Sequence, residues 1–325
     1  MIVFHSHPLL EKIVLAEQKI RSFVLQTPLH HSVPLSEITG AEVHLKMESE
    51  QYTNSFKIRG ALNKIFSLSK EDRSKGVITS STGNHAQGVA MSCMIAQCSG
   101  TIYLPKGVNS SKVEAIQRYP VEIVFCQGNA LETELQAKNE AIVQGRPWIS
   151  PYNDSHIIAG QGTIGVELKR QLANINNVLI TVGGGGLISG IGLYMKAHFP
   201  DINIIGCQPT GSAAMYQCIR AGRILNVDHN ETLSDGSAGD VEQGSITFPI
   251  CRDFVDDYIL VTEEEIKKAI QFMIEKHHKI VEGAAAVSVA GLLKQKEEFK
   301  ASKTVVIICG ANISSSALTK VLISK

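Results

Sequence analysis

Segments with a β-strand pattern alternate with segments of helical pattern along most of the chain, and this alternation constrains the fold more than any other feature. Each expected strand is a short, mostly apolar run, and a longer stretch with apolar residues at helical spacing follows it. Such alternation is typical of βαβ units, in which helices cover a parallel sheet. We therefore predict an α/β protein with mostly parallel sheets. The expected strands are residues 41–48, 77–80, 100–105, 121–126, 177–182, 203–209, 257–261 and 304–312.

The length of 325 residues exceeds what one small hydrophobic core supports and indicates two domains. Residues 51–150 contain the first run of alternating patterns and form the expected small domain. The longer run lies in residues 151–325, and an amphipathic helix expected at residues 8–24 needs a surface to pack against. We therefore predict a large, discontinuous domain made of residues 1–50 and 151–325.

The charge balance favours a small-molecule partner. Lys plus Arg and Asp plus Glu each total 31, so the formal net charge is zero. A nucleic acid or an anionic membrane would call for a basic excess or patch. Residues 178–195 carry no charge, but the four glycines among them would break a membrane-spanning helix. We expect neither nucleic acid nor membrane as a partner.

Seven cysteines are scattered along the chain without a C-x-x-C pair. This odd, dispersed set argues against a disulfide framework or a structural zinc site and favours a reducing compartment. The first residues, MIVFHSHPLLEK, lack the basic, apolar and small-residue regions of a secretory signal. The sequence therefore predicts a cytoplasmic protein.

Four consecutive glycines stand between an expected strand and an expected helix in TVGGGGLISG, Thr181–Gly190. Backbone N–H groups that converge at a helix N-terminus attract a phosphate. The segment lacks the lysine of a P-loop and does not fit G-x-G-x-x-G in any register. A tight turn alone would not need four glycines, since each costs conformational entropy on folding. We interpret the segment as a phosphate-binding loop.

Lys57 lies beside Phe56 in SFKIRG, Ser55–Gly60, at the start of a helical pattern. A lysine amine is a nucleophile only when it is neutral, and a dry pocket lowers its pKa enough to make that possible. Most lysines are solvated surface charges, so Lys57 alone is a weak signal. Its companions along the chain decide the interpretation.

A second polar loop, TSSTGNHAQG at residues 79–88, also follows a strand and opens a helix. Its hydroxyls and the Asn84 amide suit a carboxylate, although ordinary N-capping by Ser or Thr explains them equally well. Near the C-terminus, IICGAN ends an expected strand with Cys309. A buried cysteine is most often a small inert hydrophobe.

Together the motifs SFKIRGA, STGNHAQG, IAGQGTIG, GGGG and CGAN, in this order, resemble the fold-type II pyridoxal-phosphate enzymes. The likeness is greatest to the serine/threonine dehydratase and serine racemase family, and it runs from Thr27 to the last strand. It implies a tryptophan synthase β-like arrangement of two domains, with the large domain binding the cofactor pyridoxal 5′-phosphate. It also implies a homodimer.

The resemblance assigns the cofactor site. It implies that Lys57 forms the Schiff base, that Phe56 packs against the pyridine ring and that Asn84 bonds the ring hydroxyl. Cys309 would face the pyridine nitrogen, and Glu282 matches a family position near the cofactor, although a helix N-terminal acid is an equally good interpretation. The phosphate would be held by the N–H groups of Gly183, Gly184, Gly185, Gly186 and Leu187.

The implied reaction is β-elimination on a β-hydroxy amino acid, most simply L-threonine or L-serine, to a 2-oxo acid and ammonia. Lys57 would remove the Cα proton. Thr82 stands where the racemases of the family carry a serine that serves the opposite face. Racemisation is therefore a minor alternative, since β-branching restricts the Thr82 hydroxyl. The residues expected around the substrate are Ser81, Thr82, Asn84, His85, Tyr152 and Asp235.

Three departures from the family leave the substrate open. Tyr152 replaces the phenylalanine or asparagine of relatives, and the loop LSDGSAGDVEQGS differs from the pattern of ordinary threonine dehydratases. Asp240 and Glu242 have no counterpart that we can assign. Hydroxyaspartate, phenylserine or a hydroxyectoine-derived amino acid are alternative substrates, and a non-catalytic amino-acid-binding protein is the alternative from another class.

The metal site of the metal-dependent relatives has lost its charged ligands. Those positions read Gln208 and Ala214, and Ser212 offers only its carbonyl. Hard divalent cations prefer several charged oxygen ligands. We therefore predict no metal there. No regulatory extension follows Lys325, so we expect no feedback inhibition by isoleucine.

Overall fold

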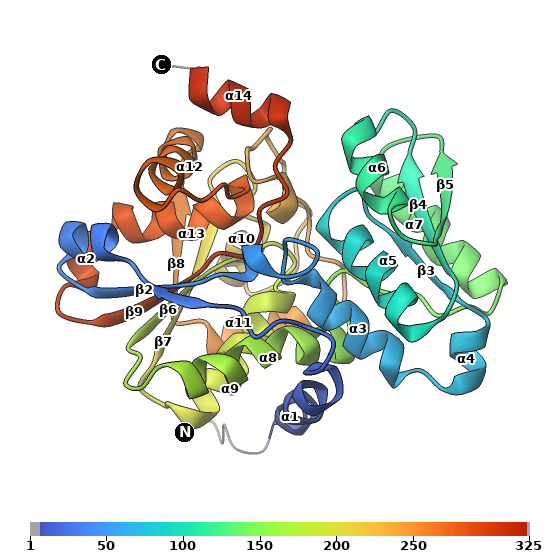
Figure 1. Cartoon of the computed structure of the whole chain (residues 1–325), viewed down its shortest axis with the longest axis horizontal. Helices are drawn as coiled ribbons and strands as arrows, with labels where there is room; N and C mark the ends of the chain where they lie inside the picture. Colours follow the sequence, from blue (N-terminus) through green and yellow to red (C-terminus); the bar gives the residue numbers. More distant parts are fainter. Residues whose placement is uncertain (1–6, 324–325) are drawn as a thin grey trace.

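The computed structural model describes residues 7–323 and contains two sheets (Figure 1). The larger sheet has the strand order β1-β2-β9-β6-β7-β8, and the smaller has the order β3-β4-β5. Every pairing is parallel except that of β1 with β2. The protein is therefore an α/β protein of two domains with mostly parallel sheets. The strands are β1 (Leu29–His31), β2 (Glu42–Lys46), β3 (Val77–Ser80), β4 (Gly100–Pro105), β5 (Glu122–Cys126), β6 (Asn177–Thr181), β7 (Asn203–Pro209), β8 (Asp257–Val261) and β9 (Lys303–Ile307).

Helices cover both sheets. In the larger domain α13 packs on one face of the sheet and α9 on the other, with α8 packed beside α9 and α1 packed against α8 (Figure 1). The helices are α1 (Pro8–Ile20), α2 (Val33–Thr39), α3 (Lys57–Ser67), α4 (Lys70–Ser74), α5 (Asn84–Ala96), α6 (Ser110–Gln117), α7 (Ala130–Val143), α8 (Ser155–Gln171), α9 (Gly186–His198), α10 (Ala214–Ala221), α11 (Thr247–Phe254), α12 (Glu263–His277), α13 (Gly283–Lys294) and α14 (Ser315–Ile323). Short 3₁₀ turns are η2 (Glu48–Glu50), η3 (Asp235–Ser237) and η4 (Lys296–Phe299).

All eight expected strands are present, each shorter than or equal to its predicted range. The helix after β8 begins with a capping box, because Thr262 and Glu265 each accept the other's backbone N–H. Helix α8 begins at Ser155, where the Asp154 side chain caps it. Residues 157–168 are buried on every side, so this stretch has no polar face to give a helical period.

Strand β1 and the helices α4, α11 and α14 were not predicted. Each has nine residues or fewer, which is too short for a clear period in the sequence. Strand β1 is also the antiparallel edge of the larger sheet, with Leu29 opposite Lys46. Strand β1 pairs with β2, and β2 pairs on its other side with β9, which lies near the C-terminus.

The two sheets draw their strands from different parts of the chain. Strands β3 to β5 of the smaller sheet all come from residues 51–150, while β1 and β2 join strands from residues 151–325. The boundaries at residues 50 and 150 stay a prediction. Among residues 7–323, no helix has the length and apolar character that crossing a membrane requires.

Candidate active site

Lys57 is the first residue of α3 and lies at the wall of a cavity of about 870 Å³. Its Nζ donates a hydrogen bond to the carbonyl of Pro151 at 2.9 Å and lies 5.2 Å from the centroid of the Phe56 ring. Burial lowers the pKa of Lys57 to about 8, while Cys309 and Glu282 act in the opposite direction. A larger fraction of this amine is neutral near neutral pH than of a solvated lysine.

The four glycines predicted to bind phosphate connect β6 to α9, which begins at Gly186. Gly185 has a φ of 86°, in the left-handed region that favours glycine. A Cβ on Gly184 would lie 2.5 Å from the Tyr152 ring, and one on Gly183 would lie 2.9 Å from the Ser237 carbonyl oxygen. The loop therefore has room for backbone only, and it presents N–H groups at a helix N-terminus.

All ten predicted cofactor residues line the same cavity, although they come from both domains. Asn84 begins α5 of the smaller domain. In the larger domain Glu282 is the N-cap residue of α13, and Cys309 lies two residues after the end of β9. This convergence is the strongest geometric support for a common site. The predicted residues that line the cavity are Phe56, Lys57, Asn84, Tyr152, Gly183, Gly184, Gly185, Gly186, Leu187, Glu282 and Cys309.

Four of the predicted substrate residues do not line this cavity: Ser81, Thr82, His85 and Asp235. His85 is buried, its Nε2 lies 3.0 Å from the Ile149 carbonyl oxygen, and burial together with Lys57 lowers its pKa to about 3. Asp235 is largely exposed and forms an ion pair with Lys112 at 2.9 Å. Their roles stay predictions.

Glu282 is held by two asparagines. Asn84 Nδ2 donates to Oε1 at 2.7 Å and to Oε2 at 3.0 Å, and the Asn312 backbone N–H donates to Oε2 at 3.0 Å. Asn312 Nδ2 in turn donates to Asn84 Oδ1 at 2.7 Å. Burial raises the pKa of Glu282 to about 7, although these hydrogen bonds act against the shift. Asn312 was not predicted as a site residue, and its place in the motif CGAN was the available signal.

The Glu282 carboxyl makes stability depend on pH. Its pKa is raised from the ordinary 4.5 to about 7, so the folded chain keeps a proton that the unfolded chain has already lost between these values. The free energy of unfolding should therefore decrease as pH rises from 4.5 to about 7, by on the order of 2–3 kcal/mol from this group.

Glu282→Gln removes this titration. We expect the difference in free energy of unfolding between the variant and the original chain, measured by urea unfolding without cofactor, to shift in favour of the variant as pH rises through this window. Using the difference cancels the other titrating groups. A difference independent of pH would show that Glu282 does not hold a proton in the folded chain.

A polar network closes one side of the cavity around Tyr152. The Tyr152 hydroxyl accepts the Glu242 backbone N–H at 2.9 Å, and burial raises its pKa, so it stays neutral. The Glu242 carboxylate accepts from Lys138 at 2.7 Å and from Asn153 at 2.8 Å. Since Lys138 belongs to α7 of the small domain, Glu242 connects that domain to the long loop of residues 226–245. The sequence alone gave Glu242 no role.

The position of the relatives' metal site is occupied by an amide with two partners. Gln208 Nε2 donates to the Val182 carbonyl at 3.1 Å, and Oε1 accepts the Tyr216 N–H at 2.8 Å. The Ser212 hydroxyl lies 2.8 Å from His229 Nδ1. Within residues 7–323 no three His, Cys, Asp or Glu side chains are grouped so as to hold a metal ion.

Comparisons with known proteins agree with this geometry. A family model described as pyridoxal-phosphate dependent enzyme matches residues 20–310. The chain is 39% identical over 317 residues to an L-threonine ammonia-lyase of Thermotoga maritima, a match that covers 96% of this chain and 78% of that one.

Two solved structures are similar over nearly the whole chain. One is the processed form of threonine deaminase isoform 2 from Solanum lycopersicum, with a TM-score of 0.92, 34% identity and coverage of 97% of this chain and 93% of that one. The other is a maize serine racemase, with a TM-score of 0.90, 33% identity and coverage of 96% of each chain.

Proposed function

The chain belongs to the family of pyridoxal-phosphate-dependent enzymes, and from this premise we propose that it is a lyase that deaminates L-threonine. The products are 2-oxobutanoate and ammonia, and L-serine is the second substrate of the same class. The observation that carries the proposal is that the buried Lys57 amine and the four-glycine loop line the same cavity. Relatives named threonine ammonia-lyase and threonine deaminase support the choice of substrate.

The residues of the cavity fit the cofactor. The four-glycine loop offers N–H groups to a phosphate, and Gly184 has no room for a side chain because a Cβ there would lie 2.5 Å from the Tyr152 ring. Lys57 has the lowered pKa that Schiff-base formation with the cofactor's aldehyde requires, and Phe56 offers an apolar ring beside it. The Asn84 amide and the Cys309 thiol complete the set that would hold the pyridine ring. Burial raises the pKa of Cys309, so the ring nitrogen would face a neutral group.

Pyridoxal phosphate, when bound, supplies an electron sink for the carbanion that forms when the Cα proton leaves. The chain supplies the base, because the Lys57 amine, once free, accepts that proton. Loss of the β-hydroxyl releases one water, and hydrolysis of the enamine product consumes one, so the net products are the 2-oxo acid and ammonia. Glu282, tied to Asn84, fixes an amide at the edge of the site.

The test is release of 2-oxo acid from a panel of L- and D-hydroxyamino acids by the protein loaded with cofactor. We expect the highest kcat/KM with L-threonine and a lower value with L-serine. Higher activity with hydroxyaspartate, phenylserine or a hydroxyectoine-derived amino acid would replace the substrate but keep the reaction. Interconversion of L- and D-serine would assign a role to Thr82. No turnover of any of them would favour an amino-acid-binding protein.

Activity should not depend on a divalent cation. Both ends of the Gln208 amide are already hydrogen-bonded to the backbone, and the uncharged Ala214 offers no ligand. We expect a chelator to leave the rate unchanged within about twofold, since hard cations need charged oxygen ligands. A loss of activity on chelation that magnesium restores would contradict this prediction.

The assembly and location of the enzyme are further parts of the proposal. A homodimer is supported by the resemblance to its family, and light scattering at several concentrations measures it directly. A cytoplasmic location is supported by the seven cysteines, none of which forms a disulfide and six of which are buried. Fractionation of the source cells tests it.

A further inference from the structure

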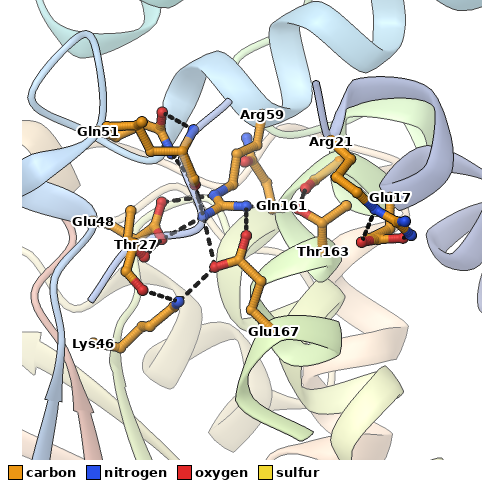
Figure 2. A network of polar contacts seen from close by, with 12 residues as sticks. Glu17, Arg21, Thr27, Lys46, Glu48, Gln51, Arg59, Gln161, Thr163 and Glu167 are labelled. Carbon is orange, nitrogen blue, oxygen red and sulfur yellow. Dashed lines mark hydrogen bonds and ion pairs between the residues drawn. The ribbon is translucent and has the colours of Figure 1, made fainter. Parts of the chain in front are cut away.

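Arg59 lies in α3, two residues after Lys57, at the centre of a cluster of buried ionic side chains (Figure 2). Its Nε and Nη2 donate to the two oxygens of Glu48 at 2.8 and 2.9 Å. Nη1 donates to Glu167 at 2.6 Å and to Thr163 at 3.2 Å. Carboxylates therefore accept hydrogen bonds along two edges of the planar guanidinium group, a geometry that lysine cannot reproduce.

The cluster is balanced in charge and joins distant segments. Lys46 pairs with Glu167 and donates to the Thr27 carbonyl at 2.8 Å, while the Thr27 hydroxyl donates to Glu48 at 2.6 Å. Two cations face two carboxylates, drawn from β2, η2, α3 and α8. Apolar side chains could fill such a space at equal or better stability, because burying ions is costly. The cluster therefore invites an explanation other than stability.

The first turn of α3 needs a support of this kind. The helix has no side-chain hydrogen bond at its N-cap, Phe56. Its neighbours touch it through backbone: a Cβ on Gly160 of α8 would lie 2.6 Å from Gly60 Cα, and one on Gly88 of α5 would lie 3.0 Å from the Lys57 carbonyl carbon. Such contacts bring the helices close, and the Gly60 N–H donates to Gln161 Oε1 of α8 at 3.2 Å. The Arg59 fork adds charge-assisted contacts from the first turn of α3 to both η2 and α8, which fix rotation and register.

We propose that Arg59, held by Glu48 and Glu167, is a positioning residue that sets the rotation and register of α3. It thereby keeps the Lys57 amine buried and hydrogen-bonded to the Pro151 carbonyl. Residues two apart on a helix are separated by about 200°, so Arg59 anchors one face while Lys57 faces the cavity from the other. The proposal rests on the proposed function only in taking Lys57 as the reactive amine.

The proposal is tested on the chain without cofactor, through the pH dependence of Lys57 acylation. Brief exposure to an amine-reactive anhydride, followed by peptide mass spectrometry, compares Lys57 with the exposed Lys75. The midpoint for Lys57 should lie near 8 in the original chain. The charged or titratable groups near its amine are Glu282, Cys309 and His85, and no variant below alters them.

Arg59→Lys keeps the charge but loses the fork. We expect the Lys57 midpoint to rise by at least about one pH unit, since a displaced amine regains water. With cofactor and substrate, kcat should fall about 100-fold, the scale of a 1 Å misplacement. Glu167→Gln keeps the shape and one acceptor of Glu167 and should give a smaller shift in the same direction. It carries the test alone if Arg59→Lys does not fold.

The matched control is Asp256→Asn, which weakens a second ion pair of the larger domain, Lys196–Asp256 at 2.6 Å. It should lower the unfolding temperature without moving the Lys57 midpoint. An unchanged midpoint in folded Arg59→Lys or Glu167→Gln overturns the proposal, as does an equal shift in Asp256→Asn. Acylation needs no turnover, so a shifted midpoint in a chain that deaminates nothing would refute the proposed function alone.

Discussion

Lys57→Ala should lower 2-oxo acid release from L-threonine by at least about 10⁴-fold, since it removes both the covalent anchor and the Cα base. Lys138 also lines the cavity, but its amine is held in ion pairs with Glu242 at 2.7 Å and Glu134 at 2.9 Å. The rate is measured by coupled reduction of the 2-oxo acid. The cofactor's visible absorbance band, measured in the same sample, should lose its lysine-bound form.

The control for this variant is Lys75→Ala. Lys75 is an exposed lysine beside α4 that forms ion pairs with Glu71 and Asp72. Its loss should leave the rate within about twofold, since exposed ion pairs contribute little. Retention of more than a small fraction of the activity by Lys57→Ala, with the protein folded, would assign the chemistry to another residue.

Gly184→Ala should weaken cofactor binding by about 10- to 100-fold, in line with the 1–3 kcal/mol that overpacking costs. The added Cβ would lie 2.5 Å from the Tyr152 ring, so either the ring or the loop must shift. The Thr247 hydroxyl donates to the Gly184 carbonyl at 2.7 Å and resists movement of the loop. Titration of the cofactor into the apo chain, followed by its absorbance, measures the affinity.

The cause of the Gly184→Ala effect is tested by a double variant and a control. Adding Tyr152→Ala to Gly184→Ala removes the colliding ring and should raise the cofactor affinity of that variant. The same Tyr152→Ala change in the original chain should be less favourable for affinity, and a double-mutant cycle measures this difference as a coupling. Gly211→Ala is the control, since the nearest atom to its added Cβ would be 3.4 Å away. Equal losses in Gly211→Ala and Gly184→Ala would rule out a specific role for the loop.

The fold could be predicted where its signal is local. Buried parallel strands such as β6 and β9 contain continuous apolar runs with polar residues before them, so each was visible in the sequence alone. The start of α8 was not visible, because a helix buried on all sides has no period. Strand β1 depends on pairing with β2 and gave too short a pattern.

The site could be predicted only in part, and for a related reason. The four-glycine loop is recognisable because it carries its chemistry within a few neighbouring residues, whereas Lys57 is recognisable only together with the other motifs along the chain. The hydrogen bond from Lys57 to Pro151 and that from Asn312 to Asn84 join residues 94 and 228 positions apart. The pairing of Arg59 with Glu167 spans 108 positions. Such partners are set by tertiary packing, which one sequence does not reveal.

The central claim is that the Lys57 amine holds the cofactor. Reducing the loaded protein with borohydride and mapping its peptides by mass spectrometry tests this claim most directly, because reduction makes the bond to lysine permanent. We predict one modified site per chain, in the peptide that contains Ser55–Gly60, with the added mass on Lys57. Modification of a different lysine, or an unmodified Lys57 in a protein that retains its visible absorbance, would contradict the claim.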